Sequence, residues 1–213
     1  MDCYRDLDDL IQAFALFTNQ TPFYGSVIVC IDEPGVRKLI PTVERPVITY
    51  GLDKKAQIAG VDIRLSENRT SFQAYSYGQK LGLVELAVPG EHNVKNALAA
   101  ITVGLELEIP WQKINLGLKD FTGVKRRFQI LFQDERYIIV DDYAHHHSEV
   151  KATLSAAKAG YHKRIIALFQ PHLFTRTRDF HREFGPVLKL ADIALIAPIT
   201  RPGKNPSPAS ARN

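Results

Sequence analysis

The stretch IIVDDYAHHHSEV (residues 138–150) decides the fold of the second half of the chain. It begins as a short apolar strand, and the polar segment after that strand leads into the helical pattern SEVKATLSAAKAG. Two further strand patterns, RIIALFQP and IALIAPI, follow with the helical pattern RTRDFHREFGPVLKLA between them. This alternation of strands and helices predicts a Rossmann-like half with parallel strands.

The segments before this run predict a second, different unit. A hairpin-like pair, FQILFQ and RYIIVDDY, turns around Asp134-Glu135. Upstream of it we expect helices over 6–18, 33–40, 93–107 and 110–121, strands over 25–32 and 46–51, and antiparallel strands between 56 and 88. The sequence therefore predicts an α/β chain of two domains, residues 1–122 and 123–213, with a loose tail rich in Pro, Ser and Gly.

The composition is that of an ordinary soluble protein, with 45% apolar and 23% charged residues in 213. No apolar run approaches the roughly 18 residues of a membrane helix, and the acidic start MDCYRDLDDL is no signal peptide. Two cysteines, Cys3 and Cys30, are too few for a disulfide framework, so we expect a cytoplasmic protein without a membrane partner. The net charge of +4 is scattered except at KRR (125–127), which favours small anions over nucleic acid as ligands.

PGEHNVKNALAAI (89–101) places two amides at the start of a predicted helix. Asn93 and Asn96 lie three residues apart and therefore share one face, and His92 or Asn93 can cap the helix. One interpretation is a capped helix with two solvated amides. The other is an amide pair that faces a purine or a phosphate at the helix N-terminus.

Asp142 follows a predicted strand at its carboxyl end, where α/β folds bind their ligands. An ionised carboxylate accepts two hydrogen bonds there and suits a ribose diol. The basic triplet in GVKRRF (123–128) is either a solvated turn or the source of an arginine for a nucleotide's ring or phosphates.

The three consecutive histidines raise the hypothesis of a metal site. On an extended segment His145 and His147 face one way and His146 the other, and no cysteine lies near, so the pattern does not favour a metal. Ser148 is expected to be the N-cap of the following helix.

FQPHLFTRTRDF (169–180) follows the next predicted strand and carries His172, Arg176 and Arg178. A helix N-terminus with these cations can receive a carboxylate or a phosphate, and an exposed cationic turn fits the pattern equally well. The phosphate-binding pattern G-x-x-x-x-G-K-[ST] is absent from the sequence.

Five blocks, in this order and spacing, resemble the Mur ligases: TPFYGSVIVCID, PGEHNVKNALAAI, GVKRRF, VDDYAHHHSEV and FQPHLFTRTRDF. The resemblance implies an ATP-dependent carboxylate–amine ligase of peptidoglycan synthesis that joins L-alanine to UDP-N-acetylmuramate through an acyl phosphate, with ATP and Mg²⁺ as cofactors. It also implies a fragment that is inactive alone: the back half of a central ATPase domain (1–122) and the front of a Rossmann-like C-terminal domain (123–213). Alternatives are a non-catalytic nucleotide-binding remnant, or a related Mur ligase that acts on a muropeptide.

Residue by residue, the resemblance assigns two groups of side chains and no catalytic residue or metal ligand. The cofactor-binding group lies near the adenine, the ribose and the phosphates: Asn93, Asn96, Arg127 and Asp142. The substrate-binding group surrounds the incoming amino acid and the acyl phosphate: Tyr143, His145, His172 and Arg176. The sequence departs from the family pattern in three places. His147 replaces a usual proline, and Leu173 replaces an arginine that is common there. The stretch IAPITRPGK lacks the Asp-x-Tyr-Pro-Ala-Arg-Glu pattern expected after the last strand.

Overall fold

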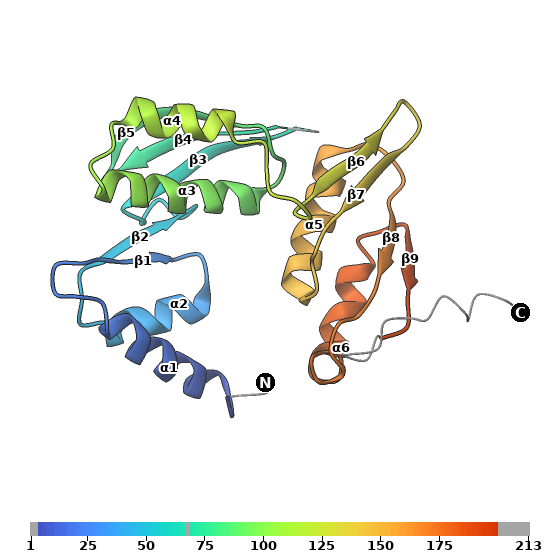
Figure 1. Cartoon of the computed structure of the whole chain (residues 1–213), viewed down its shortest axis with the longest axis horizontal. Helices are drawn as coiled ribbons and strands as arrows, with labels where there is room; N and C mark the ends of the chain where they lie inside the picture. Colours follow the sequence, from blue (N-terminus) through green and yellow to red (C-terminus); the bar gives the residue numbers. More distant parts are fainter. Residues whose placement is uncertain (1–3, 67–68, 200–213) are drawn as a thin grey trace, which may run out of the picture.

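The computed structural model describes residues 4–66 and 69–199, which form two units lying side by side (Figure 1). The N-terminal unit contains α1–α4 and β1–β5, and the C-terminal unit contains α5, α6 and β6–β9. Among the described residues, no helix has both the length and the apolar character needed to cross a bilayer. The predicted loose tail, residues 200–213, lies outside the described residues.

The N-terminal unit is built on one five-stranded sheet in the order β1-β2-β3-β4-β5. β1, β2 and β3 pair in parallel, and β3, β4 and β5 pair in antiparallel fashion. The antiparallel strands expected between 56 and 88 are thus confirmed, whereas the parallel pairing of β3 with β2 was not predicted. The elements are α1 (Leu7–Asn19), β1 (Val27–Cys30), α2 (Pro34–Leu39), a 3₁₀ turn (Ile40–Thr42), β2 (Val47–Gly51), β3 (Ile58–Leu65), β4 (Thr70–Ser76), β5 (Gln79–Leu86), α3 (Glu91–Glu106) and α4 (Trp111–Asp120).

α3 packs tightly on this sheet and fixes the position of its own N-terminus. Val94 and Leu98 of α3 are fully buried against Phe72 and Val84 of the sheet. Gly60 in β3 allows the close approach, because a Cβ there would lie only 3.1 Å from Leu98 Cδ1. Full burial of such side chains contributes roughly 1.5–3 kcal/mol each, so the helix that carries the amide pair is firmly held.

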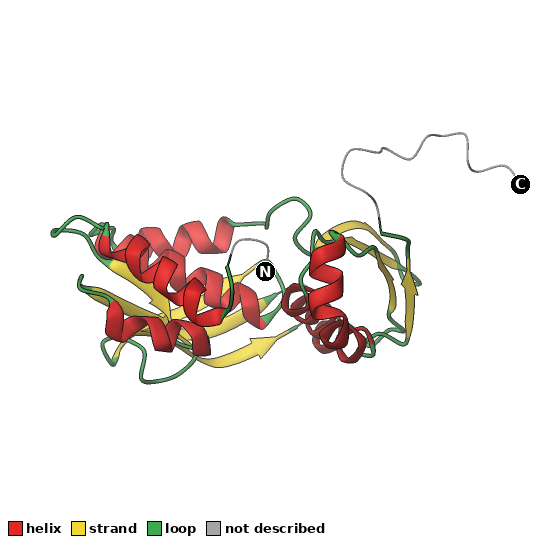
Figure 2. Cartoon of the chain, turned by 90° about the horizontal axis from the view of Figure 1, so that it is seen from below, coloured by secondary structure: helices red, strands yellow, loops and turns green. Residues whose placement is uncertain are grey.

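The C-terminal unit has the predicted order of strands and helices: β6 (Gln129–Gln133), β7 (Ile138–Asp141), α5 (His147–Gly160), β8 (Ile166–Phe169), α6 (Phe174–Leu188) and β9 (Ile193–Ile196). α5 and α6 pack together around a small core that includes Leu154, Phe169 and Phe184. Figure 2, turned from the first view, shows the helices of this unit on the side that faces the N-terminal unit.

The expected parallel sheet of this unit is interrupted. β8 and β9 pair in parallel, but the only ladder of β7 in the described chain is its antiparallel pairing with β6. The prediction that Asp142 follows a strand with parallel partners is therefore wrong in this respect, although Asp142 does lie directly after β7. Two-stranded ribbons twist more strongly than wide sheets, which is consistent with the separation of β7 from β8.

Both predicted helix caps are also wrong. α3 begins at Glu91 with Gly90 as N-cap, so His92 and Asn93 lie inside its first turn. Gly90 has φ 100° and ψ 144°, a conformation that is open to glycine and strained for other residues. At α5 the N-cap is His146 and not Ser148, because the His146 side chain accepts a hydrogen bond from the Ser148 backbone N–H.

Candidate functional site

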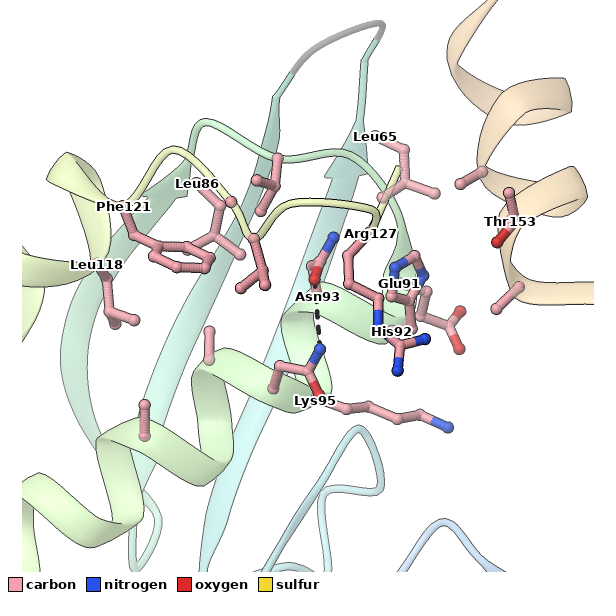
Figure 3. Close-up of a pocket in the computed structure, with 18 of the residues that line it drawn as sticks. Leu65, Leu86, Glu91, His92, Asn93, Lys95, Leu118, Phe121, Arg127 and Thr153 are labelled. Atoms are coloured by element: carbon pink, nitrogen blue, oxygen red, sulfur yellow. Dashed lines mark hydrogen bonds between the residues drawn. The ribbon is translucent and has the colours of Figure 1, made fainter. Parts of the chain in front are cut away.

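A cavity of about 1390 Å³ lies between the two units, with walls from α3, α4, α5 and the chain between α4 and β6. Its lining includes all four residues of the predicted cofactor-binding group: Asn93, Asn96, Arg127 and Asp142. Figure 3 shows Asn93 and Arg127 near each other in this pocket, with Thr153 of α5 across it. Residues that are far apart in the sequence thus share one cavity.

The amide pair occupies the first two turns of α3. Asn93 donates from Nδ2 to the carbonyl oxygen of Pro89 at 2.7 Å, and its own Oδ1 accepts from Asn96 Nδ2 at 3.3 Å. These bonds fix the half-buried Asn93 amide, and the exposed Asn96 lines the cavity beside it. An amide oriented in this way offers both a donor and an acceptor, which suits the edge of a purine base.

The Asp142 carboxylate accepts three hydrogen bonds from the protein itself. Oδ2 accepts from the Phe128 N–H and from Thr153 Oγ1, both at 2.9 Å, and Oδ1 accepts from the Ala144 N–H at 2.8 Å. A carboxylate has about four acceptor positions, so one remains for a ligand. Asp142 therefore ties three segments together in addition to facing the cavity.

Arg127 extends toward α5 from a tight turn of backbone. Its neighbours Arg126 and Phe128 both have positive φ, at 58° and 46°, in the turn that precedes β6. Arg127 Nη1 lies 3.5 Å from Glu149 Oε1. Arg126, by contrast, is not part of the cavity lining. It pairs with Asp141 at 3.2 Å and lies over the Tyr143 ring.

His92, which the sequence suggested only as a cap, also lines the cavity. Burial of the imidazole is the largest effect on it and lowers the pKa of His92 from its usual value. The cations of Arg127 and Lys95 act in the same direction, whereas Asp142 and Glu91 oppose them. The lowered pKa of His92 could not be predicted from the sequence, because the charges of Arg127 and Asp142 belong to the other unit.

The predicted substrate-binding group lies outside the cavity lining and is partly assembled. The ring of His145 is 5.1 Å from that of Tyr143 and 6.2 Å from that of His172, measured between centroids. Arg176 has a buried Nη1 for which no hydrogen-bond partner is found among the described residues. Three of the four side chains thus form one cluster, and Arg176 adds a cation with an unused donor on α6.

The other two histidines of the triplet pack against α6. The rings of His146 and His147 lie 5.0 and 5.4 Å from that of Phe180. Burial, followed by the neighbouring His147 and Arg176 charges, lowers the pKa of His146. Within residues 4–66 and 69–199, no three His, Cys, Asp or Glu side chains come together in a way that could hold a metal ion.

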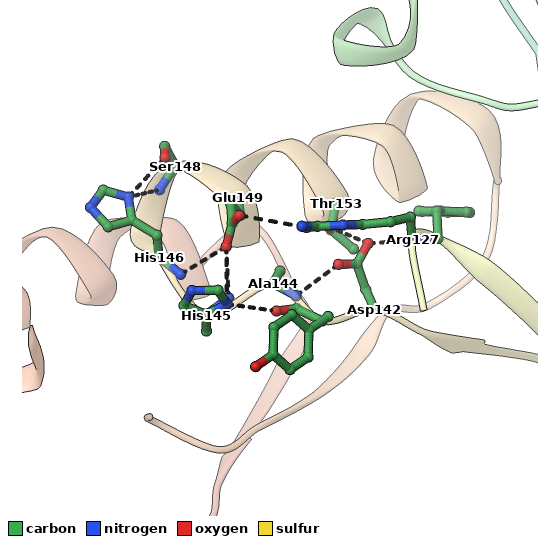
Figure 4. A network of polar contacts seen from close by, with 10 residues as sticks. Arg127, Asp142, Ala144, His145, His146, Ser148, Glu149 and Thr153 are labelled. Carbon is green, nitrogen blue, oxygen red and sulfur yellow. Dashed lines mark hydrogen bonds and ion pairs between the residues drawn. The ribbon is translucent and has the colours of Figure 1, made fainter. Parts of the chain in front are cut away.

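Glu149 contacts both Arg127 and His145, and its role could not be recognised from the sequence. It occupies the third position of α5 and accepts hydrogen bonds from the backbone N–H groups of His145 and His146, as Figure 4 shows. A glutamate three residues after a cap is a recognised helix-start signal. With Ser148 expected as the cap, Glu149 stands one residue after it, and the signal is hidden.

Comparison with known proteins identifies the family. The model of the Mur ligase middle domain matches residues 1–104, and that of the Mur ligase glutamate ligase domain matches residues 126–213. The chain belongs to the Mur ligase family. The expected mixed α/β fold, with the middle and C-terminal parts of a Mur ligase in this order, is thereby confirmed.

Individual Mur ligases show the same relationship. The chain is 47% identical over 201 residues to UDP-N-acetylmuramate–L-alanine ligase of Pelodictyon phaeoclathratiforme, and 42% identical over 208 residues to that of Syntrophotalea carbinolica. These matches cover 93% and 98% of this chain but 42% and 45% of the relatives, so the chain spans less than half of their length.

Solved structures of Mur ligases also match. The UDP-N-acetylmuramate–alanine ligase of Thermotoga maritima has a TM-score of 0.73 at 27% identity, over 92% of this chain and 42% of that one. A MurF ligase from the same organism, solved in complex with ADP, has a TM-score of 0.74 at 16% identity over 91% and 48% of the two chains, which shows a common fold.

Proposed function

We propose that this chain forms the nucleotide- and amino-acid-binding part of an ATP-dependent ligase that joins L-alanine to UDP-N-acetylmuramate in peptidoglycan synthesis. In this proposal residues 1–122 belong to the central ATP-binding domain and residues 123–213 to the C-terminal domain. One observation carries it: an amide pair, an arginine and a carboxylate from separate segments line one large cavity.

The residues present fit the nucleoside part of ATP. Asn93 and Asn96 would contact the adenine, Asp142 would use its remaining acceptor position on the ribose, and Arg127 would face the phosphates. The cavity exceeds the roughly 300–1000 Å³ of common ligand sites, so it has room for a nucleotide. The structurally similar MurF ligase was solved in complex with ADP, which favours an adenine nucleotide as the ligand. When bound, ATP would supply the phosphoryl group that activates a carboxylate.

The second cluster would receive the amino acid. Arg176 brings a cation whose Nη1 has no hydrogen-bond partner among the described residues, and a guanidinium binds a carboxylate through parallel hydrogen bonds. Tyr143, His145 and His172 would supply the remaining polar contacts around the small side chain of alanine. No three His, Cys, Asp or Glu side chains come together as a metal site among the described residues, and no step through Mg²⁺ is assigned to this chain's side chains.

Two measurements test the proposal. Calorimetric titration of the 213-residue chain with ADP should show one binding site, and Asn96→Ala should weaken the affinity by about fivefold or more, since each lost hydrogen bond is worth about 1 kcal/mol. Asn115→Ala, on α4 and away from the cavity lining, is the matched control.

The second measurement uses a chimera in which this chain replaces the matching segment of the Pelodictyon ligase, to which it is 47% identical. The chimera should release phosphate from ATP when given UDP-N-acetylmuramate and L-alanine together. A folded chimera that turns over only with a different amino acid or a muropeptide would refute the substrate assignment.

A further inference from the structure

One side chain, that of Glu149, lies between the cavity and the proposed amino-acid site at His145. Its Oε1 lies 3.5 Å from Arg127 Nη1, on the side of the cavity. Its Oε2 accepts from the backbone N–H of His145 at 3.0 Å and lies 3.4 Å from His145 Nδ1. Figure 4 shows the carboxylate between the arginine and the histidine.

Glu149 is held where both contacts are possible. It lies in the first turn of α5, and its Oε2 also accepts from the His146 N–H at 3.2 Å, which secures the helix start. The side chain lines the cavity, whereas His145 does not. The carboxylate thus contacts Arg127 of the cavity with one oxygen and His145 of the proposed amino-acid site with the other.

The surroundings of Glu149 favour its charged carboxylate form. Burial, the largest single effect, would raise the pKa of Glu149, but the two backbone N–H donors and the charges of His145 and Arg127 together lower it from its usual value. His145 Nδ1 lies 2.9 Å from the Tyr143 carbonyl oxygen in addition to the Glu149 carboxylate. Both neighbours only accept hydrogen bonds, so Nδ1 carries its proton and the imidazole orientation is fixed.

We propose that Glu149 is a positioning residue that couples nucleotide binding at Arg127 to the amino-acid site at His145. The inference rests on the proposed function, because Arg127 must respond to the nucleotide. When the phosphates engage Arg127, its pairing with Glu149 changes, and the field and hydrogen bonding at His145 change with it. Such a relay needs no motion of the units, only a redistribution of contacts around one carboxylate.

The test uses the whole chain labelled with ¹⁵N-histidine, whose seven histidines are assigned by single substitutions. ADP is added to saturation, and the ring signals of His145 are followed by NMR. In the unmodified chain these signals should move, although His145 is not part of the cavity lining. In Glu149→Gln the amide oxygen can still accept from the helix N–H groups, but the charge is lost, and the movement should disappear.

Because the His145 signals are compared when the site is saturated with ADP, their movement does not depend on any change in ADP affinity. A direct effect of the nucleotide charge on His145 would persist in Glu149→Gln, and that result would overturn the inference. Glu135→Gln, on the tip between β6 and β7, is the matched control and should keep the movement. If Glu149→Gln does not fold, Arg127→Gln breaks the same ion pair from the other side and leaves the start of α5 intact.

Failure of the inference is distinct from failure of the proposed function. Absence of ADP binding to the unmodified chain would refute the nucleotide site, and the coupling with it. ADP binding that leaves the His145 signals unchanged would refute the coupling alone.

Discussion

The Asp142 carboxylate holds segments of the C-terminal unit together, in addition to its proposed role at the ribose. Its three internal hydrogen bonds join the turn before β6, the loop after β7 and the first half of α5. The sequence indicated its place, because a polar residue at the end of an apolar strand is a common ligand position. The donors around it could not be predicted, since Phe128 and Thr153 reach it only through the tertiary fold.

Substitutions at Asp142 and His172 should separate the two pockets in the chimeric ligase. Asp142→Ala should raise the apparent KM for ATP by about ten- to a hundredfold, because a hydrogen bond to a charged group is worth roughly 1.5–3 kcal/mol. His172→Ala should raise the KM for L-alanine and have little effect on that for ATP, because His172 is not part of the cavity lining. Saturation curves against each substrate measure both.

The same Asp142→Ala change should also destabilise the fold, since the three donors lose their acceptor. We expect the free energy of unfolding to fall by about 1–3 kcal/mol, measured by urea denaturation. Equal shifts of both saturation curves in both variants would show that the division into two pockets is wrong.

At the scale of single elements, most helices and strands were predictable, and their first residues were not. The pattern of apolar residues indicated α1, α3 and the strands of the first sheet, because the burial of apolar side chains determines that pattern. The caps depend on local backbone conformation, and Gly90, the N-cap of α3, provides no side-chain hydrogen bond. A preference for Asn or Ser at helix starts therefore pointed to Asn93 and Ser148, which lie within the helices.

Gly90→Ala should be strongly destabilising. A Cβ there would lie 2.7 Å from His92 Cε1 and 3.1 Å from Ala156 Cβ of α5, and the φ of 100° is itself strained for alanine. Strain of this kind costs about 1–3 kcal/mol, so the midpoint of thermal unfolding should fall by several degrees.

Gly117→Ala supplies the control for that measurement. Gly117 lies within α4, and a Cβ added there would meet nothing within 4 Å, so alanine should stabilise the helix by about 0.5–1 kcal/mol. A Gly90→Ala variant as stable as the unmodified protein would mean that the start of α3 has a different backbone conformation.

At the scale of the whole molecule, His92 makes stability depend on pH at the junction of the two units. Its pKa is lower in the folded protein than its usual 6.5, so the unfolded chain takes up the proton first as the pH falls. The free energy of unfolding is therefore unaffected by His92 well above pH 6.5 and decreases as the pH falls below about 6.5. His146, with its lowered pKa, acts in the same direction.

Urea denaturation between about pH 7.5 and about pH 5.5 measures this effect. The free energy of unfolding should decrease over that range, and the decrease should be smaller in His92→Gln. Glu149 does not interfere, because its lowered pKa affects stability only below its usual value of 4.5. An identical pH dependence in the variant would exclude His92 as a source.

The hydrogen bond from the Phe128 N–H to the Asp142 carboxylate also closes the base of the β6–β7 hairpin, where Gln129 pairs with Asp141. The tip of the hairpin, at Asp134, lies at the opposite end of these strands. Extra residues inserted at the tip would lengthen an already closed loop, and each doubling of loop length costs only about 0.6 kcal/mol in chain entropy. The hairpin can therefore vary in length from one relative to another while the residues of the cavity keep their places.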